Sequence, residues 1–211
     1  LFAGATIHPI VLSDDFVLRA GDVARDVWRR TRLLWTCTPH NPTGAVTGRA
    51  DLEELLAAAR SHGTLLLSDE CYADVYEPAV YPSGPTSILQ VAGNGQEGVL
   101  AFFSLSKRSG MTGYRSGAIV GDASAIAALK RLRTATGTAS PEFVQSAAVA
   151  AWSDDAHAAE RLDIFAAKRA VLRKAFDQLG MAGVGSTAGL DLWVVVADVL
   201  SIRERLGGGG G

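Results

Sequence analysis

Residues 102–121 read FFSLSKRSGMTGYRSGAIVG, and the rest of the fold is predicted outward from this stretch. Apolar residues 99–103 end at two small hydroxyl side chains, Ser104 and Ser106, and Lys107 follows directly. The lysine therefore stands where a buried strand is predicted to end. Lysine is rarely buried without a partner, and desolvation favours its neutral amine, a nucleophile that can form Schiff bases. Lys107 is the first candidate catalytic residue.

Glycines follow the lysine, and an arginine lies among them. Gly110, Gly113 and Gly117 allow tight backbone turns, and Arg115 brings a planar, permanently charged guanidinium eight residues after Lys107. Two hydroxyls, a lysine and an arginine so close in sequence suit a cofactor that carries both an aldehyde and a phosphate. A solvated turn punctuated by glycines is the alternative interpretation of this stretch.

The composition is that of a globular chain. It has 211 residues, 48% of them hydrophobic, and a formal net charge of -2, so a core can form and no basic excess indicates a nucleic-acid partner. Cys37 and Cys71 lie in apolar segments, which favours buried, reduced thiols, and no zinc-ligand spacing occurs, so no metal is expected. No apolar stretch reaches the roughly 18 residues that cross a bilayer, and no signal peptide is visible. A cytoplasmic location is expected.

Short apolar runs alternate with amphipathic stretches through the first three quarters of the chain. Strands are predicted over residues 6–12, 32–37, 64–68, 99–103 and 117–120, and helices over residues 50–62, 123–136 and 142–152. In the first helix Thr47 or Gly48 is the predicted cap. This alternation predicts an α/β fold with a mostly parallel sheet and helices on both faces. Such sheets bind ligands at the carboxyl ends of their strands.

The pattern changes after Ser153 and predicts the domain organisation. Residues 156–179 have the spacing of one long helix, and residues 181–185 and 192–196 look like two strands of a smaller α+β unit. We therefore divide the chain into a large domain over residues 1–155, a connecting helix with part of a small domain over residues 156–206, and a flexible glycine tail over residues 207–211. Because the chain opens at Leu1 inside an apolar stretch, a fragment lacking both ends is expected.

A loop rich in proline follows the second predicted strand and reads Thr-Pro-His-Asn-Pro-Thr-Gly over residues 38–44. Each proline forces the preceding residue towards extended geometry, and Gly44 permits positive φ. The loop is therefore stiff and presents the Asn41 amide in one orientation. A common turn without a binding role is the alternative. His40 could touch a substrate, while the histidines as a set lack ligand spacing.

Residues 65–72 read LLLSDECY and place an acid at a strand end. An isolated buried charge costs several kcal/mol, so Asp69 needs a cationic partner, which a protonated ring nitrogen would supply. Tyr72, three residues later, can reach the same ligand from the side of Asn41. A helix cap or turn acid is the alternative role for Asp69.

The lysine stretch closely resembles the signature S-x-S-K-x-x-G-(apolar)-x-G-x-R-x-G of the class I and II pyridoxal-phosphate aminotransferases. Its fixed positions are present as Ser104, Ser106, Lys107, Gly110, Met111, Gly113, Arg115 and Gly117. The Asn-Pro-Thr-Gly loop and the D-x-x-Y acid motif also match this family. The resemblance covers residues 1–196, and it implies the large domain of fold type I enzymes followed by the start of a small α+β domain.

The resemblance implies a role for each matched residue. Lys107 would hold pyridoxal 5'-phosphate covalently and move the substrate proton, and Asp69, rather than Glu70, would keep the ring nitrogen protonated. The other cofactor-binding residues are Asn41 and Tyr72 at the phenolic oxygen, and Ser104, Ser106 and Arg115 at the phosphate. Ping-pong transamination with glutamate and 2-oxoglutarate, and a homodimer, are further implications. The chain looks most like the actinobacterial succinyldiaminopimelate aminotransferases, which implies N-succinyl-LL-2,6-diaminopimelate as substrate and a role in lysine biosynthesis.

Departures from the family leave alternatives open. This sequence has no match for the family's early phosphate loop or for its ring-stacking aromatic residue. It also has no match for the family's late carboxylate-binding arginine, since Arg203 and Arg205 come too early. Asp191 stands where the family usually has an aromatic or small residue. The alternatives are another class I/II aminotransferase, a carbon-sulfur lyase, a regulator's effector domain, or an inactive remnant of the fold. We expect the 211 residues of this chain, on their own, not to turn over substrate.

Overall fold

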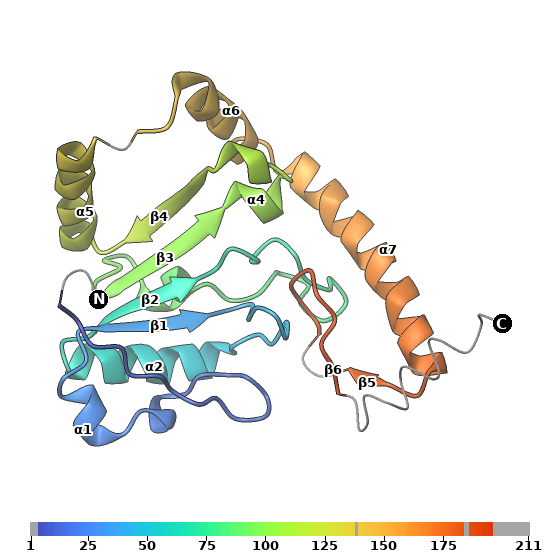
Figure 1. The fold of residues 1–211 in the computed structure, drawn as a ribbon, viewed down its shortest axis with the longest axis horizontal. Helices are drawn as coiled ribbons and strands as arrows, with labels where there is room; N and C mark the ends of the chain where they lie inside the picture. The colour runs from blue at the N-terminus through green and yellow to red at the C-terminus, as the bar shows by residue number, and fades with distance from the viewer. Residues whose placement is uncertain (1–3, 138, 184–185, 196–211) are drawn as a thin grey trace.

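The computed structural model describes residues 4–137, 139–183 and 186–195, and its centre is a mixed sheet. The sheet has the order β1-β2-β3-β4, formed by Leu33–Cys37, Leu65–Asp69, Val99–Ser104 and Gly117–Gly121. Strands β1, β2 and β3 are parallel, and β4 pairs antiparallel with β3 (Figure 1). The predicted α/β class with a mostly parallel sheet is confirmed.

Helices cover one face of this sheet. They are α2 (Arg49–Ser61), α3 (Ile88–Ala92) and the short α1 (Arg25–Trp28), preceded by the 3-10 turn η1 (Ala20–Asp22). The predicted apolar face of α2 is buried against the strands, and Gly48 is its N-cap. The core of this layer consists of Leu34, Leu52, Leu55, Leu56, Ala59, Leu66, Ile88, Val99 and Ala101, among others. Each such leucine stabilises the fold by roughly 1.5–3 kcal/mol through burial.

The opposite face of the sheet carries the residues that alternate with this core. Leu33 is 57% exposed and Trp35 is 56% exposed, and the Trp35 ring lies 4.8 Å from the Phe102 ring, centroid to centroid. Strand register pairs Asp69 with Phe102, so the acid at the end of β2 belongs to this second face. The candidate acid is therefore turned away from the helix-covered core.

The predicted strand over residues 6–12 is wrong. No regular element is formed there, and no strand among the described residues pairs with it. Its side chains nevertheless alternate, since Ile10 and Leu12 pack against the core while Ile7 and Val11 are exposed. A strand is defined by its hydrogen-bonded neighbour, and this apolar pattern has burial without such a neighbour.

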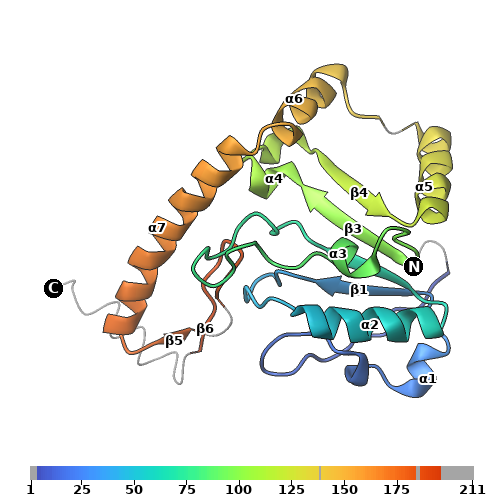
Figure 2. The ribbon, with the colours of Figure 1, turned by 180° about the vertical axis from the view of Figure 1, so that it is seen from behind.

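The remaining helices lie beyond the lysine stretch. Helix α4 (Leu105–Arg108) and the 3-10 turn η2 (Thr112–Tyr114) join β3 to β4, and α5 (Ala123–Thr136), α6 (Glu142–Trp152) and α7 (Ala156–Gln178) follow. Helix α7 runs from beside α4 to the small antiparallel pair β5 (Ala182–Gly183) and β6 (Val194–Val195) (Figures 1 and 2). The long helix and both late strands were predicted and are present. The domain boundaries stay a prediction, and the glycine tail lies outside the described residues.

Two properties of the described residues bear on function. None of their helices combines the length and the apolar character needed to cross a membrane. Likewise, their histidine, cysteine and acidic side chains form no group of three or more that could hold a metal ion.

Candidate active site

The candidate residues follow strands that end at one edge of the sheet. Strands β1, β2 and β3 run parallel, so the ends at Cys37, Asp69 and Ser104 lie at the same edge. Every site residue predicted from the sequence lies at one of these strand ends or in the segment that follows it. This is the position at which open α/β sheets bind their ligands.

The proline-rich loop after β1 is fastened to the sheet and to itself. The Thr38 amide donates to the Asp69 carbonyl oxygen at 3.0 Å, which continues the β1–β2 pairing past the strand end. Within the loop, the Gly44 amide donates to the His40 carbonyl oxygen at 2.7 Å, and Gly44 has φ of 71° as predicted. The peptide bonds before both prolines are cis. The two hydrogen bonds, from the Thr38 amide and from the Gly44 amide, hold the backbone of Asn41 in place.

Asn41, Tyr72 and Lys107 converge on one point. Asn41 Nδ2 donates to the Tyr72 hydroxyl at 3.2 Å, and Lys107 Nζ lies 5.4 Å from the centroid of the Tyr72 ring. The ring of Tyr72 is buried, and burial, with a smaller contribution from the Asp191 carboxylate, raises the pKa of its phenol. Three residues chosen from separate motifs are therefore neighbours in space.

Asp69 and Glu70 are adjacent in sequence but differ in surroundings. Asp69 is half-buried, and its Oδ1 accepts a hydrogen bond from the Cys71 amide at 3.1 Å. Glu70 is buried on the core side, where its Oε1 accepts from Ser68 Oγ and from the Ile88 amide, both at 2.9 Å. Burial raises the pKa of Glu70. The prediction that Asp69 rather than Glu70 serves the ligand agrees with this placement.

Lys107 lies on the single turn of α4. Ser104 Oγ accepts a hydrogen bond from the Ser106 amide at 3.1 Å and caps this turn, while Leu105 is completely buried beneath it. The turn therefore leaves the sheet in a defined direction, with Lys107 half-exposed. The two predicted serines precede the lysine, one at the strand end and one on the turn.

Arg115 is less closely integrated than the lysine. Its side chain is exposed, its φ is 53°, and its Nη1 donates to the Thr112 carbonyl oxygen at 3.1 Å. The following residue, Ser116, accepts a hydrogen bond from the Leu105 amide at 3.2 Å, which brings the arginine's turn beside α4. No contact between Arg115 and either predicted phosphate serine occurs in the described part of the chain. The phosphate role of the three residues stays a prediction.

Gly117 shows why the motif requires glycine there. A Cβ atom at this position would lie 2.5 Å from the Phe103 carbonyl oxygen, a distance that backbone atoms cannot accommodate. The close pairing of β4 with β3 therefore depends on the absence of a side chain.

The two cysteines carry free thiols, as predicted, but they are half-buried rather than buried. Burial raises the pKa of Cys37 to about 11 and that of Cys71 to about 12. Both thiols are therefore neutral near pH 7 and poor nucleophiles.

The donor set fits pyridoxal phosphate. The Lys107 amine faces the Tyr72 ring and has no carboxylate partner among the described residues, and the half-buried Asp69 carboxylate has no cation there. A half-buried amine and a half-buried carboxylate without an ion-pair partner in the described part of the chain suit a ligand with both an aldehyde and a ring nitrogen. Asn41 and Tyr72 add hydrogen-bond donors beside the lysine.

Side chains that sequence reasoning passed over also border the site. The Phe16 ring stacks on the His40 ring at 6.0 Å and meets the Trp193 ring edge-on at 5.9 Å, which joins three distant segments beside the proline-rich loop. Arg108, directly after the lysine, is buried. Neither feature has a local pattern, because each depends on residues far away in sequence.

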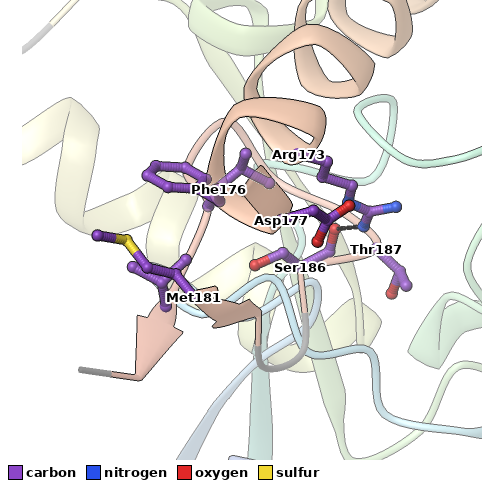
Figure 3. Close-up of a pocket in the computed structure, with 8 residues that line it drawn as sticks. Arg173, Phe176, Asp177, Met181, Ser186 and Thr187 are labelled. Carbon is purple, nitrogen blue, oxygen red and sulfur yellow. Dashed lines mark hydrogen bonds between the residues drawn. The ribbon is translucent and has the colours of Figure 1, made fainter. Parts of the chain in front are cut away.

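A pocket of about 240 Å³ lies elsewhere, between the last turns of α7 and the β5–β6 pair (Figure 3). Arg173 and Asp177 contribute its charges, and Phe176 and Met181 contribute apolar surface. None of the predicted site residues lines it. The cavity and the candidate active site are therefore separate features.

Comparison with known proteins gives one family and consistent relatives. A family model described as aminotransferase class I and II matches residues 2–206. The 4-dedimethylamino-4-oxo-anhydrotetracycline transaminase OxyQ of Streptomyces rimosus is 40% identical over 77% of this chain and 45% of its own length. An LL-diaminopimelate aminotransferase of Nitratidesulfovibrio vulgaris is 31% identical over 92% of this chain and 50% of its own length.

A solved structure agrees in fold. It is described as a probable N-succinyldiaminopimelate aminotransferase from Thermus thermophilus, and it superposes with a TM-score of 0.80 at 28% identity, over 93% of this chain and 53% of that protein. The chain thus spans about half the length of the relatives it matches.

Proposed function

Since this chain belongs to the class I and II aminotransferase family, we propose that it provides the lysine and most of the cofactor-binding residues of a pyridoxal-phosphate-dependent aminotransferase. The observation that carries the proposal is the meeting of Lys107, Tyr72 and Asn41 at the carboxyl edge of a mostly parallel sheet. Three separate motifs of the family are assembled there into one group.

Each side chain has a defined task in this proposal. Lys107 would hold the cofactor through its aldehyde, and once the substrate amine has displaced it there, its freed amine would remove the proton from the substrate α-carbon. Asp69 holds a proton on the ring nitrogen, because a carboxylate favours the charged form of a neighbouring base. When bound, pyridoxal phosphate supplies an electron-withdrawing ring that stabilises negative charge at the α-carbon.

The remaining residues bind and orient. Asn41 and Tyr72 hold the phenolic oxygen of the cofactor, and Ser104, Ser106 and Arg115 hold its phosphate. Arginine suits this task because its planar fork makes charge-assisted hydrogen bonds to phosphate oxygens. The exposed guanidinium of Arg115 has a hydrogen bond only to its own turn in the contacts described above, so it can swing towards a phosphate without breaking a buried pair.

We propose N-succinyl-LL-2,6-diaminopimelate as the substrate, with 2-oxoglutarate and glutamate as the amino acceptor and donor. The names of the Thermus thermophilus structure and of the Nitratidesulfovibrio vulgaris relative support a diaminopimelate-type substrate and a role in lysine biosynthesis. The 40% identity to OxyQ favours a second candidate, transamination of a ketone on a polycyclic ring system. A homodimer and a cytoplasmic location remain predictions from the family resemblance.

The first experiment locates the cofactor. The protein is mixed with pyridoxal phosphate, reduced with borohydride and mapped by peptide mass spectrometry, with Lys107→Arg as the control. We expect the label on Lys107 in the wild type and no label in the variant. Label on Lys130 or Lys168 in place of Lys107 would overturn the assignment.

The second experiment separates the candidate reactions. The full-length protein that contains these residues, purified and loaded with pyridoxal phosphate, is given glutamate with the keto forms of succinyldiaminopimelate, of diaminopimelate and of a tetracycline-type ring ketone, and 2-oxoglutarate is measured. We expect the succinylated substrate to give the largest kcat/KM. Release of ammonia and pyruvate from cysteine conjugates, without 2-oxoglutarate formation from glutamate, would identify a carbon-sulfur lyase instead.

A further inference from the structure

The three residues directly after the candidate lysine all contact the beginning of α7. Arg108 reaches Asp155, Ser109 reaches His157, and Gly110 lies against Arg161. Asp155 directly precedes α7, and His157 and Arg161 lie about one turn apart on it, so one side of the helix end meets residues 105–111, the lysine turn. These contacts form a dock between the lysine turn and α7.

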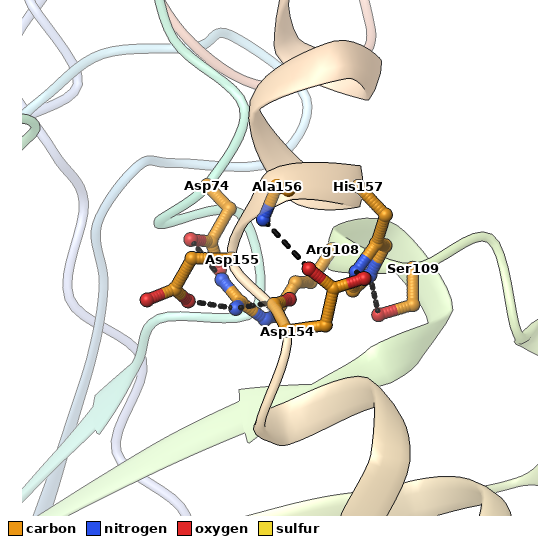
Figure 4. Close-up of polar contacts among 7 residues, drawn as sticks. All are labelled: Asp74, Arg108, Ser109, Asp154, Asp155, Ala156 and His157. Carbon is orange, nitrogen blue, oxygen red and sulfur yellow. Dashed lines mark hydrogen bonds and ion pairs between the residues drawn. The ribbon is translucent and has the colours of Figure 1, made fainter.

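Arg108 is the centre of this dock (Figure 4). Its side chain is only 9% exposed, and its Nη1 donates to Asp74 Oδ1 at 2.8 Å. Its Nη2 donates to Asp155 Oδ1 and to the Asp154 carbonyl oxygen, and its guanidinium lies 5.6 Å from the centre of the Trp152 ring. The arginine therefore joins the loop after β2 to the junction of α6 and α7.

Ser109 makes the second contact of the dock. Its hydroxyl shares a hydrogen bond of 2.8 Å with His157 Nε2, and His157 Nδ1 lies 3.2 Å from Asp154 Oδ2. The other oxygen of Asp154 accepts from the Ala156 amide at 2.8 Å, at the first residue of α7. One carboxylate thus orients the histidine and satisfies the helix start (Figure 4).

Gly110 makes the third contact. Its φ is 66°, and a Cβ atom there would lie 2.7 Å from Arg161 Nη1. The Arg161 guanidinium also lies 5.3 Å from the centre of the Phe165 ring, one turn further along α7. The glycine therefore allows the lysine turn and the helix to approach closely.

The lysine turn needs such support because it is too short to hold itself. Helix α4 has only four residues, and isolated helices shorter than about 12 residues are marginal in water. Within the lysine turn, the Ser109 and Met111 amides both donate to the Leu105 carbonyl oxygen, at 3.0 and 3.2 Å. The direction of Lys107 is thus set by what the neighbouring residues dock against.

We propose that Arg108 is a positioning residue for Lys107, and that its buried guanidinium pairs with Asp74 and with the exposed Asp155 to hold the lysine turn against the start of α7. The proposal rests on the proposed cofactor role of Lys107. It makes the placement of α7, and with it the β5–β6 unit at its far end, a determinant of where the lysine amine lies. Arg108 itself touches no reacting atom.

The test compares Arg108→Met with a matched variant, Arg60→Met. Arg60 also donates to backbone carbonyl oxygens, those of Ala92 and Glu97, but it lies at the end of α2 and far from the lysine turn. Hydrogen exchange of the Ser109 and Met111 amides is measured without cofactor. With pyridoxal phosphate added, the pH midpoint of the visible absorbance change and the fraction trapped on Lys107 by borohydride are measured.

We expect Arg108→Met to speed exchange at both amides at least tenfold, to shift the absorbance midpoint and to lower the trapped fraction, while Arg60→Met changes none of the three. Arg108→Lys, which keeps the charge but loses the fork, should be intermediate. If Arg108→Met does not fold, Asp155→Asn and Asp74→Asn test the same contacts from their more exposed side. Wild-type exchange and an unshifted midpoint in the folded variants would overturn the proposal.

The proposed function can fail separately. If wild-type protein takes up no label on Lys107, the cofactor assignment is wrong, whereas the exchange comparison still reports whether Arg108 holds the turn. Normal labelling of the wild type with unchanged exchange in the variants would instead leave the cofactor assignment standing and contradict the positioning role.

Discussion

Two neighbouring acids lie at the end of strand β2, in opposite environments. Asp69 is the last residue of the strand, and Glu70 directly follows it. Strand geometry sends successive side chains to opposite faces, so Asp69 shares the exposed face with Phe102 while Glu70 enters the core beneath α3. One acid is available to a ligand, and the other is enclosed with Oε2 lacking any partner among the described residues. The adjacent pair therefore offers matched substitutions that separate ligand binding from core packing.

Asp69→Asn should lower kcat by about a hundredfold or more, because the amide cannot hold the ring nitrogen protonated. A hundredfold corresponds to about 2.7 kcal/mol of transition-state stabilisation. Steady-state transamination kinetics with glutamate measure the effect, and Glu70→Gln is the control that keeps most of the wild-type rate. Near-normal turnover of Asp69→Asn would show that the reaction does not depend on this carboxylate.

Glu70 should make stability depend on pH. Burial raises the pKa of this group in the folded state, so the stabilising state is the protonated one, fully present below the unfolded pKa of about 4.3. As pH rises through the folded pKa this contribution is lost. Glu70→Gln resembles the protonated acid in shape, so its free energy of unfolding should exceed that of the wild type by an amount that grows with pH.

Urea unfolding between pH 4 and pH 8 measures this difference. Glu54→Gln, at an exposed position of α2, is the control for the same chemical change outside the core. If the free energy of unfolding of Glu70→Gln differs from that of the wild type by the same amount at every pH, Glu70 ionises in the folded state as readily as in the unfolded chain.

At the scale of elements, caps and close backbone contacts decide where helices begin. Asp122 is the N-cap of α5, and its Oδ1 accepts hydrogen bonds from the Ser124 and Ala125 amides at 2.9 and 3.0 Å. Its Oδ2 accepts from the Gly98 amide at 3.0 Å, just before β3 begins. The same carboxylate therefore starts a helix and fastens it to the sheet.

Asp122→Ala should reduce the free energy of unfolding by about 1–2 kcal/mol at pH 7, the usual range for a lost helix cap. The hydrogen bond from the Gly98 amide, with those of Ser124 and Ala125, lowers the pKa of Asp122 to about 2. The contribution is therefore present above the unfolded pKa of about 3.9 and is lost as pH falls towards 2.

Chemical unfolding of both proteins at pH 7 and pH 3 checks this prediction. The difference in free energy of unfolding between wild type and Asp122→Ala should become smaller at pH 3. Asp163→Ala, at an exposed position of α7, should unfold with the free energy of the wild type at both pH values. A gap that is constant with pH would mean that the cap acts through packing rather than through its charge.

At the scale of the molecule, α7 connects the candidate active site to the β5–β6 unit. Its beginning docks on the lysine turn through Arg108, and further along it Arg169 is buried. Arg169 Nη1 donates to the Ser186 carbonyl oxygen at 3.0 Å and to that of Ala188 at 3.4 Å, and Nη2 donates to that of Gly189. Helix α7 is therefore attached to the lysine turn at its beginning and to residues 186–189 further along.

Arg169→Met should release residues 186–193 from α7. The substitution keeps much of the side-chain volume but leaves the Ala188 and Gly189 carbonyl oxygens without their charged donor, while the Ser186 carbonyl keeps its bond from Arg173 Nη2. A hydrogen bond to a charged group is worth about 1.5–3 kcal/mol. Limited proteolysis should cut this segment at least tenfold faster than in the wild type. Lys168→Met, at the preceding exposed position, is the control, and equal cleavage of both variants would contradict the anchoring role.

The sequence by itself determined the main-sheet strands, the longer helices and the identity of the candidate residues, but not the short helices α1, α3 and α4. Helices α5 and α6 have the predicted bounds, and the four strands of the main sheet fall within one residue or so of their predicted ends. These features are local, because apolar periodicity, caps and glycines act over a few neighbouring residues. The lysine signature is also local, which is why Lys107 could be selected without a structure.

Only the tertiary structure decided which residues meet. The Asn41–Tyr72 hydrogen bond joins residues 31 apart, and the Arg108–Asp155 contact joins residues 47 apart. The sequence suggested the Asn41–Tyr72 meeting only through strand ends and the family resemblance, because it depends on strand order. The Arg108–Asp155 contact has no sequence pattern, since it depends on the placement of α7. Residues 6–12 show the same dependence on tertiary structure. An apolar, β-prone run becomes a strand only when another strand supplies hydrogen-bond partners. The described part of the fold supplies no such strand there.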